Sequence, residues 1–410
     1  MRHSAEIRDL TDAVASEGTL LASILGRSES MFAEDMAAEA GRLADAIDGG
    51  RFLVIGAAGS IGAAFVRELT RFRPARLHLI DISENGLVEL VRELRSSPVI
   101  LPPDFRTASL DFGDTEFTRF ALDHAPYDAL INFSALKHVR AERDVYSLMR
   151  MIKVNVESLK RGLDLSGRLG LRRAFSVSTD KSVRPANLMG ATKNLMEKTL
   201  FRADVEPIAS SARFANVAFS GGSLLEGFQQ RLRKGQPLSA PSDVRRYFIS
   251  EREAGELCLL ACFLTERRQV LFPKLDANRH LLSLADIATQ VLAHHGLTPH
   301  LCGSEEEAIH ARNLPKDRWP CYFSASDTTG EKMVEEFHRS IDIVDLKRYR
   351  AAAVTREEPT DPRLIDDFLA EIARLRAAPA WRKAEIVAAI RAAVPELDHR
   401  ELDRDLDQKM

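Results

Sequence analysis

From residue 51 onward, short apolar runs alternate with longer segments in which apolar residues recur every three or four positions. The short runs have the length of buried strands, and the longer segments have the spacing of amphipathic helices. The first strands are expected at 52–55, 77–80, 107–110, 129–133 and 174–178. Because a strand, a helix and a second strand make a right-handed crossover, this order predicts an α/β fold with a doubly wound parallel sheet.

The first of these strands is followed by a glycine-rich loop that opens a helical segment. Glycines let the backbone turn tightly and approach a pyrophosphate, and the N-terminus of a helix presents unpaired N–H groups to phosphates. A loop with a strand before it and a helix after it therefore predicts a Rossmann-type dinucleotide site. The residues expected to line this site are Gly56, Ala58, Gly59, Ser60, Ile61 and Gly62.

Acidic residues end the second and third strands. Asp81 is placed to accept hydrogen bonds from both ribose hydroxyls of an adenosine, and its charge would repel a 2′-phosphate. This favours NAD over NADP as the cofactor. Asp111 is placed to meet the adenine, although a turn residue at the end of a strand is nearly as good an interpretation. Ser134, just after the fourth strand, is a further expected contact of the cofactor.

Changes of pattern along the chain predict four parts. They are a helical N-terminal arm (1–49), an NAD-binding domain (50–220), a smaller substrate-binding lobe (221–354) and a helical C-terminal extension (355–410). The third part is rich in connections that carry proline, which suits a lobe that covers the carboxyl edge of the sheet and can share strands with it. The terminal helical parts need apolar partners, so we expect a homo-oligomer.

Charge and hydropathy exclude several other classes of protein. Lys plus Arg number 57 and Asp plus Glu number 60, which gives a formal net charge of −3. This balance gives no reason to expect nucleic acid or an anionic membrane as a partner. The N-terminal residues lack the apolar core of a signal peptide, and no segment approaches the roughly 18 apolar residues of a membrane helix. We therefore expect a cytoplasmic protein.

The four cysteines do not have the spacing of a metal site. Cys258 and Cys262 share an apolar helical stretch, and no second Cys/His pair stands at the spacing of a zinc finger. We expect no metal and interpret these thiols as buried, reduced side chains.

The fifth strand ends in Ser178-Thr179-Asp180-Lys181, and Met189-Gly190-Ala191-Thr192-Lys193 follows on an expected helix. These motifs resemble the extended short-chain dehydrogenase/reductase family, and within it the group of UDP-N-acetylglucosamine 4,6-dehydratases and polysaccharide-biosynthesis proteins. Further similar stretches are Asn132-Phe133-Ser134-Ala135-Leu136-Lys137-His138-Val139, Arg213-Phe214-Ala215-Asn216-Val217 and Arg246-Tyr247-Phe248. The resemblance runs from about residue 51 to 275 and is most specific over 177–193.

The resemblance implies an internal redox cycle on a nucleotide sugar. Hydride leaves C4 of the sugar for NAD⁺, and the resulting 4-ketone acidifies the proton at C5. A base removes that proton, hydroxide departs from C6 with the help of an acid, and hydride returns to C6. The family also usually pairs through helices. The expected function is therefore that of an NAD-dependent 4,6-dehydratase in surface glycan synthesis, acting on a UDP-N-acetylhexosamine and on UDP-N-acetylglucosamine in the first place.

The residues of the fifth strand's end fit the roles that this cycle requires. Thr179 can donate a hydrogen bond to the C4 oxygen as charge develops there. Asp180 fits the general acid for the C6 hydroxyl, provided that its surroundings raise its pKa. Lys181 fits the base at C5, provided that desolvation or a nearby cation lowers its pKa. Without the surrounding motifs, Asp180 and Lys181 would be interpreted as a surface ion pair.

The expected helix departs from the wider family at Met189. In that family the lysine corresponding to Lys193 holds the nicotinamide ribose and lowers the pKa of a tyrosine at the position of Met189. Methionine has no proton to exchange, although some members of the dehydratase group also carry it. Lys181, or Lys193 acting through water, are then the candidate bases for oxidation at C4. A chain without this activity, serving as a non-catalytic NAD-binding regulator, is an alternative.

Several polar residues outside this segment are expected to meet the substrate. Lys137 follows the fourth strand, at the sheet edge where ligands of such folds bind. Guanidinium and amide groups suit the diphosphate, which points to Arg213, Asn216 and Arg246. A 4,6-dehydratase that also epimerises C5, or another nucleotide-sugar epimerase, uses the same cofactor and stays an alternative.

Overall fold

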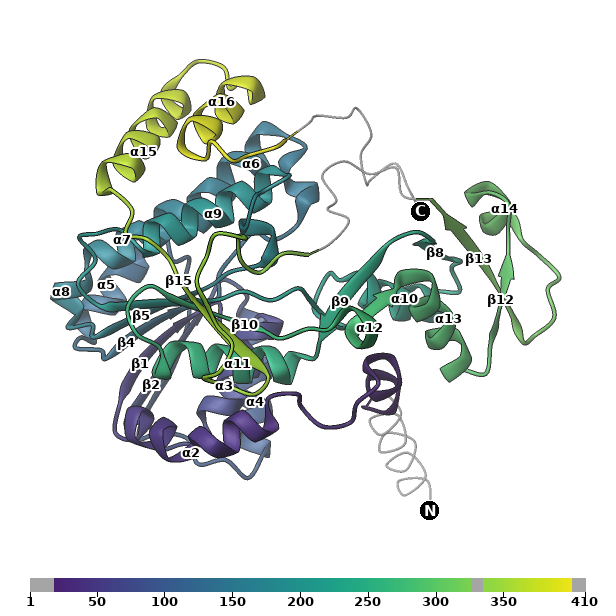
Figure 1. Ribbon diagram of the computed structural model, residues 1–410, viewed down its shortest axis with the longest axis horizontal. Helices are drawn as coiled ribbons and strands as arrows, with labels where there is room; N and C mark the ends of the chain where they lie inside the picture. The colour runs from purple at the N-terminus through teal and green to yellow at the C-terminus, as the bar shows by residue number, and fades with distance from the viewer. Residues whose placement is uncertain (1–17, 326–334, 400–410) are drawn as a thin grey trace.

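The computed structural model describes residues 18–325 and 335–399 of the 410-residue chain (Figure 1). A nine-stranded sheet lies at its centre, in the order β14-β15-β10-β6-β5-β4-β1-β2-β3. The strands are β1 (Arg51–Ile55), β2 (Arg76–Asp81), β3 (Asp104–Ser109), β4 (Ala129–Asn132), β5 (Arg173–Val177), β6 (Ile208–Ala212), β10 (Gln269–Pro273), β14 (Val344–Asp345) and β15 (Ala352–Arg356). Neighbours from β10 to β3 are parallel, whereas β15 is antiparallel to β10 and β14. The predicted Rossmann-type α/β fold is confirmed.

Strand β1 explains why helices cover both faces of this sheet. Phe52 and Val54 belong to one buried cluster, and Leu53 and Ile55 belong to another. Because successive side chains of a strand point to opposite faces, a continuous apolar run needs cover on both sides. The first face is covered by α2 (Ala33–Ile47), α3 (Ser60–Leu69), α4 (Glu84–Ser96) and α11 (Glu251–Leu264). The second is covered by α5 (Thr115–Asp123), α7 (Ser158–Asp164), α8 (Ser166–Leu169) and α9 (Leu188–Leu200).

Helix α11 is buried along nearly its whole length between α2, α3 and the sheet. It begins with a capping box in which Ser250 and Glu253 exchange side-chain and backbone hydrogen bonds. Glu253 also binds the Arg27 guanidinium at 2.7 Å, which fastens the N-terminal arm to this helix. Cys258 and Cys262 are fully buried free thiols here. Burial raises the pKa of both, that of Cys262 to about 12, so they act as small apolar side chains.

A second lobe follows the residues of β6 and lies to the right of the sheet in Figure 1. It holds two three-stranded sheets, β11-β9-β7 and β12-β13-β8. Their strands are β7 (Asn216–Val217), β8 (Leu238–Pro241), β9 (Arg245–Ile249), β11 (Leu281–Ser283), β12 (Thr298–Leu301) and β13 (Arg318–Ser324). The helices are α10 (Leu224–Arg233), α12 (Ala277–His280), α13 (Leu284–His294) and α14 (Glu305–His310). The chain between 221 and 354 thus builds this lobe and also supplies β10 and β14 to the main sheet.

The terminal helical segments find their apolar partners within the same chain. Helix α2 packs on α11, and residues 20–25 join the core of the second lobe. At the other end, α15 (Pro362–Ala377) and α16 (Lys383–Ala393) form one buried cluster with α6 (Val145–Ile152) and α9. These faces therefore give no reason to expect a second subunit, and the homo-oligomer stays a prediction. The expected helical character of residues 1–17 and 400–410 lies outside the described residues.

Membrane-spanning helices were not expected. In the part of the chain that the structure describes, no helix combines the length and the apolar character needed to cross a membrane.

Candidate active site

The glycine-rich loop connects β1 to α3 at the carboxyl edge of the parallel sheet. Gly56 has a φ of +71°, and a Cβ atom there would lie 2.6 Å from the backbone nitrogen of Ser134. A Cβ atom on Gly62 would meet the carbonyl oxygen of Gly56. Both positions therefore require glycine for the loop to close. Gly59 differs, because a Cβ atom there would meet only the Gly56 oxygen at 3.5 Å. Packing does not require glycine at 59, so the bare backbone leaves room for a ligand.

The two acidic residues also lie at this edge. Asp81 accepts hydrogen bonds from the backbone N–H of Ala58 and of Ser83, both at 2.9 Å, and so holds the loop against β2. Asp111 accepts from the N–H of Gly113 at 2.8 Å and lies 3.7 Å from the Lys153 ammonium. Each aspartate therefore orders its own loop, and each keeps unshared electron pairs that a ligand can use.

Ser134 and Ser60 connect the loop to neighbouring elements. The hydroxyl and backbone N–H of Ser134 both donate to the Asn132 side-chain oxygen, at 2.6 and 3.0 Å. The Ser60 hydroxyl accepts from the N–H of Gly221 at 2.9 Å. The latter bond joins the start of α3 to the beginning of the second lobe.

The segment after β5 forms a tight turn that carries the predicted catalytic residues, and for that reason we call it the catalytic turn (Ser178–Ser182). The Thr179 hydroxyl donates to Asp180 Oδ1 at 2.7 Å. The Lys181 ammonium lies 3.2 Å from the same oxygen and 3.5 Å from Oδ2. The Asp180 side chain is only 2% exposed and that of Lys181 is 30% exposed. The two residues therefore form an ion pair with a buried acid and a lysine that reaches solvent, which differs from an exposed surface pair.

Behind the catalytic turn lies a second set of charges. The Ser182 hydroxyl is 2.7 Å from the Thr179 carbonyl oxygen and 2.9 Å from Glu197 Oε1. Glu197 accepts two hydrogen bonds from Arg213, at 2.7 and 2.5 Å, and Arg213 also donates to Glu357 at 2.8 Å. We call Glu197, Arg213 and Glu357 the rear triad. Burial acts to lower the pKa of Arg213, but the two carboxylates outweigh it and raise that pKa.

The placement of Arg213 does not favour the role in diphosphate binding that its sequence context suggested. The side chain is 4% exposed, and its remaining nitrogen donates to the carbonyl oxygen of Phe337 at 3.1 Å. Its donors are thus committed to residues of this chain. An arginine that joins buried Glu197 to part-exposed Glu357 supports the catalytic turn from behind.

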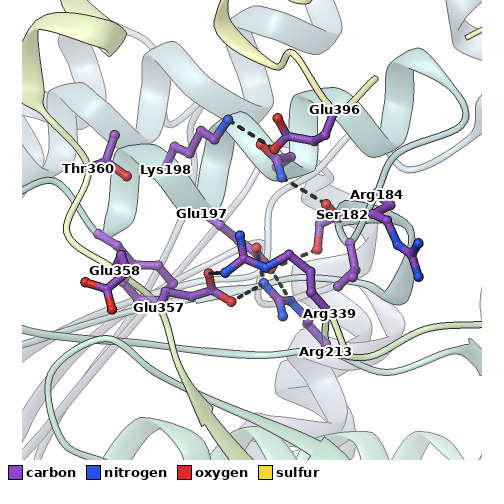
Figure 2. A pocket seen from close by; sticks show the side chains of 13 residues that line it. Ser182, Arg184, Glu197, Lys198, Arg213, Arg339, Glu357, Glu358, Thr360 and Glu396 are labelled. Atoms are coloured by element: carbon purple, nitrogen blue, oxygen red, sulfur yellow. Dashed lines mark hydrogen bonds and ion pairs between the residues drawn. The ribbon is translucent and has the colours of Figure 1, made fainter. Parts of the chain in front are cut away.

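A cavity of about 370 Å³ opens at the rear triad, as Figure 2 shows. Its lining carries acidic and basic side chains in pairs, such as Lys198 with Glu396 at 3.2 Å. Asp180 and Lys181 are not among the described residues that line it. Because its charges neutralise one another, this cavity suits ordered water around the ion pairs better than it suits a charged substrate. The lining residues are Ser182, Val183, Arg184, Asn194, Glu197, Lys198, Phe201, Arg213, Arg339, Glu357, Glu358, Thr360 and Glu396.

Met189 and Lys193 lie on the first two turns of α9, beneath the catalytic turn. The side chain of Asn187 caps this helix by accepting from the N–H of Gly190 at 2.7 Å. Met189 is buried, with 4% of its surface exposed. The Lys193 ammonium donates to the carbonyl oxygen of Val177 at 2.7 Å, at the end of β5. Burial lowers the pKa of Lys193 to about 8 against an opposing effect of Glu197, so this amine is partly neutral near physiological pH.

The expected substrate residues Asn216 and Arg246 share one small sheet, because β7 and β9 are neighbours. The Asn216 amide donates to the carbonyl oxygen of Tyr247 at 3.2 Å. One Arg246 nitrogen donates to the carbonyl oxygen of Arg245 at 2.9 Å. Lys137 lies in the loop after β4, where burial lowers its pKa and the carboxylates of Glu251 and Glu226 oppose that effect.

Glu335 is a residue of this site that sequence reasoning missed. Its carboxylate accepts from the Asn216 amide at 2.8 Å and from the N–H of Tyr247 at 2.9 Å. Burial raises its pKa to about 7, and repulsion from Asp180 adds to that shift. No motif marks this residue in the sequence. The only hint in the sequence is that two consecutive glutamates, Glu335 and Glu336, stand directly before an aromatic residue. Two such glutamates are ordinary on a protein surface.

Comparisons with known proteins agree with this fold. Residues 52–355 match the family described as polysaccharide biosynthesis protein. The chain is 31% identical over 247 residues to the uncharacterized membrane protein MJ1061 of Methanocaldococcus jannaschii, which covers 59% of this chain and 71% of that relative. It is 27% identical over 335 residues to the probable polysaccharide biosynthesis protein EpsC of Bacillus subtilis, covering 80% of this chain but only 52% of EpsC.

A further relative has a named activity. The UDP-N-acetylglucosamine 4,6-dehydratase (inverting) of Campylobacter jejuni is 25% identical over 259 residues, which is 61% of this chain and 71% of that enzyme.

Solved structures share the fold at lower identity. Pen from Bacillus thuringiensis aligns with a TM-score of 0.61 at 17% identity, covering 77% of this chain and 91% of Pen. DesIV, a dTDP-glucose 4,6-dehydratase from Streptomyces venezuelae, aligns with a TM-score of 0.50 at 17% identity, covering 70% and 93% of the two chains. At this identity the likeness establishes the architecture and leaves the chemistry to the residues of the site.

Proposed function

Because the chain belongs to the polysaccharide biosynthesis protein family, we propose that it is an NAD-dependent 4,6-dehydratase of a nucleotide sugar. The substrate class proposed is a UDP-N-acetylhexosamine, with UDP-N-acetylglucosamine first, and the product enters surface glycan synthesis. The observation that carries the proposal is the ion pair between buried Asp180 and part-exposed Lys181, with 3.2 Å between its charged atoms, at the carboxyl end of β5. An acid and a base on adjacent residues can reach groups on adjacent sugar carbons. Elimination across C5 and C6 requires this, because one proton is removed at C5 and another is donated to the hydroxyl at C6.

The residues around the glycine-rich loop fit NAD. The space beside Gly59 suits a pyrophosphate, and the N-terminus of α3 directs backbone N–H groups toward it. Asp81 keeps electron pairs for the ribose hydroxyls and would repel a 2′-phosphate, which supports NAD over NADP. The chemistry that the cofactor supplies when bound is acceptance and return of a hydride.

The protein's own residues then handle protons and charge. Thr179 donates a hydrogen bond to the oxygen at C4 and stabilises the charge that develops there. Lys181 removes the proton at C5, and Asp180 protonates the departing hydroxyl at C6. Lys193 donates to the Val177 carbonyl from a buried position, whereas the Lys181 side chain is 30% exposed. This difference in access favours Lys181 over Lys193 as the group that exchanges protons with the sugar.

The test is turnover of purified protein, loaded with NAD, on a panel of UDP-, GDP- and dTDP-linked sugars without added NADH. We expect a 4-keto-6-deoxy product, detected as the loss of one water by mass spectrometry and located by NMR. Lys181→Ala should abolish the product, and Lys160→Ala, which removes a similarly part-exposed lysine that pairs with Asp164 and Asp366 away from the turn, should retain it. Absence of product from every sugar of the panel would contradict the proposal and leave the non-catalytic NAD-binding regulator as the alternative.

A second candidate adds inversion at C5. The observation that favours it is the 25% identity to the Campylobacter jejuni enzyme, which is described as inverting. After elimination, C5 is protonated again, and a proton delivered to the opposite face inverts it. In deuterated water, deuterium at C5 with inverted configuration would identify this activity, and retained configuration would exclude it.

A further inference from the structure

Residues 335–339, which we call the strap, connect three parts of the molecule around the catalytic turn. Glu335 accepts from Asn216 of β7 and from the N–H of Tyr247 in β9. Glu336 pairs with Arg184, two residues beyond the turn, at 2.6 Å. The carbonyl oxygen of Phe337 accepts from Arg213 of the rear triad, as described above. Consecutive residues of the strap therefore bind the second lobe, the turn's exit and the triad.

The strap is anchored by apolar packing as well as by these polar contacts. The ring of Phe337 stacks on that of Phe272 in β10, with 5.9 Å between centroids and 2° between planes. The ring of Phe337 also packs near that of Tyr247, with 6.4 Å between the ring centroids. Both partners belong to the buried cluster that contains Ala215 and Ala353. Because Phe337 is fixed two residues away, the direction of Glu335 is set by the core.

Glu335 is an acidic side chain held inside the site. The residue is 8% exposed, and both carboxylate oxygens accept hydrogen bonds from the second lobe. The charged groups that face it are Asp180 and Lys181 from the catalytic turn and Arg246 from β9. The Tyr247 phenol is also close enough to interact with it, and its pKa is raised by burial and then by Glu335. One carboxyl group thus meets both the acid–base pair and the expected diphosphate residues.

We propose that Glu335 is a positioning residue of this site, which holds Asn216 and β9 against the catalytic turn and controls by its charge where the proton of the Asp180–Lys181 pair resides. The inference rests on the proposed dehydratase chemistry. The shift of its pKa to about 7, caused by burial and then by Asp180, means that this charge changes near neutral pH.

The direction of the control follows from the relative strengths of two interactions. Repulsion between Glu335 and Asp180 is larger than attraction between Glu335 and Lys181. An ionised Glu335 therefore disfavours the Asp180 carboxylate more than it favours the Lys181 ammonium. Elimination needs a proton on Asp180 to donate and an unprotonated Lys181 to accept one, and transfer of the shared proton within the pair would supply both without changing the total charge. An ionised Glu335 favours that transfer.

The test compares Glu335→Gln and Glu335→Asp with Glu336→Gln, all as NAD-loaded protein. Glu336→Gln is a matched control, because it makes the same chemical change on the adjacent residue, which pairs with Arg184 outside the acid–base pair. In wild type we expect kcat to rise as pH passes through about 7. Glu335→Gln should lose this rise and lower kcat about tenfold, the effect of one unit in an acid–base equilibrium, with KM changed less.

The conservative variant separates charge from position. Glu335→Asp keeps the charge on a shorter side chain, so it should retain a rise of kcat with pH although kcat itself falls. Glu336→Gln should follow wild type. An equal loss of kcat in Glu335→Gln and Glu335→Asp with an unchanged pH profile would overturn the role of charge, because a purely structural contact predicts that result.

A readout without turnover keeps this inference distinct from the proposed function. Difference infrared spectra between wild type and Glu335→Gln should show a carboxylate band that appears as pH passes through about 7. A band that appears near the ordinary glutamate pKa of about 4.3 would overturn the inference even if the enzyme is active. Titration near 7 in a protein that dehydrates no sugar would instead overturn the proposed function and leave the position of Glu335 established.

Discussion

The front and the rear of the catalytic turn contain similar groups in different arrangements. At the front, Asp180 and Glu335 share their surroundings with Lys181, and burial and mutual repulsion bring the pKa of Glu335 to about 7. At the rear, Glu197 and Glu357 are joined by Arg213. Burial acts to raise the pKa of Glu197, but Arg213 outweighs it and lowers that pKa.

The difference lies in the cation and its geometry. A guanidinium stays charged and donates to two carboxylates at once, whereas an ammonium is a point charge that can give up its proton. At the rear, Arg213 stays charged and keeps the pKa of Glu197 low, although burial raises the pKa of Glu357. At the front, the cation is an ammonium that can give up its proton. Similar ion pairs thus support the catalytic turn at the rear and form the proposed acid–base pair at the front.

Removing the front lysine should give the largest effect and leave the fold intact. Because Lys181→Met deletes the proposed base, kcat should fall by about 10²–10⁴-fold. The free energy of unfolding should change by less than about 1 kcal/mol, since the side chain is 30% exposed and pairs with its neighbour. Turnover assays and urea unfolding check the two parts. A large loss of stability would contradict the assignment of a reactive front.

Removing the rear arginine should do the reverse. Arg213→Met leaves Glu197 buried without its cation, which should destabilise the fold by about 3–5 kcal/mol, whereas part-exposed Glu357 keeps Arg339 at 3.6 Å. Urea unfolding measures this loss. As the control, Arg184→Met removes an arginine whose pair with Glu336 is substantially exposed, and should cost no more than about 1 kcal/mol. Equal losses in the two variants would remove the distinction between buried triad and surface pair.

Glu335 should make the stability of the fold depend on pH. Its pKa is raised from an ordinary value of 4.5 to about 7 in the folded chain. The folded state therefore holds this proton more tightly than the unfolded state, and the resulting stability is complete below about pH 4.5. It is lost as pH rises through 7, by about 3 kcal/mol in total. As pH rises through this range, the Tm of Glu335→Gln should fall less than the Tm of wild type. Parallel curves of Tm against pH for the two proteins would contradict the raised pKa of Glu335.

The smallest effect concerns the hydroxyl that links the two sides. Ser182→Ala removes the contact between Glu197 and the Thr179 carbonyl and should cost about 1 kcal/mol of stability. It should also reduce kcat, because the turn loses its link to the triad. Ser211→Ala removes a comparable buried bond, from its hydroxyl to the Ser176 carbonyl at 2.7 Å, without touching the turn. Ser211→Ala should lose about as much stability as Ser182→Ala but keep the kcat of wild type. An equal kcat in the two variants would show that the front and the rear of the catalytic turn are independent.

The parts of this molecule that sequence patterns predicted are those in which the relevant residues are neighbours in the chain. The run Phe52–Ile55 indicates a buried strand because all four side chains are apolar, and the loop that follows lies at its end. Asp180 and Lys181 are adjacent, so their ion pair follows from the sequence once the strand before them is placed. Local patterns of this kind determine local geometry.

The remaining features depend on contacts between distant residues. Glu335 meets Asn216 across 119 positions, and Arg213 meets Glu357 across 144. An arginine beside a substrate motif has the same sequence signature whether it binds a phosphate or a buried carboxylate, which is why the assignment of Arg213 was not supported by its placement. The apolar periodicity of α15 and α16 predicts helices, but it does not reveal that α6 and α9 supply their partners.

The order of these elements along the chain has a consequence for synthesis on the ribosome. The strands β1 to β6 and the glycine-rich loop are translated first, and domains begin to fold as they emerge. The strap, β15, α15 and α16 emerge last. Until they do, Arg213 lacks Glu357, and the outer face of α9 lacks its cover. A nascent chain can therefore form its glycine-rich loop and its catalytic turn well before the strap and Glu357, which support that turn from behind, have been made.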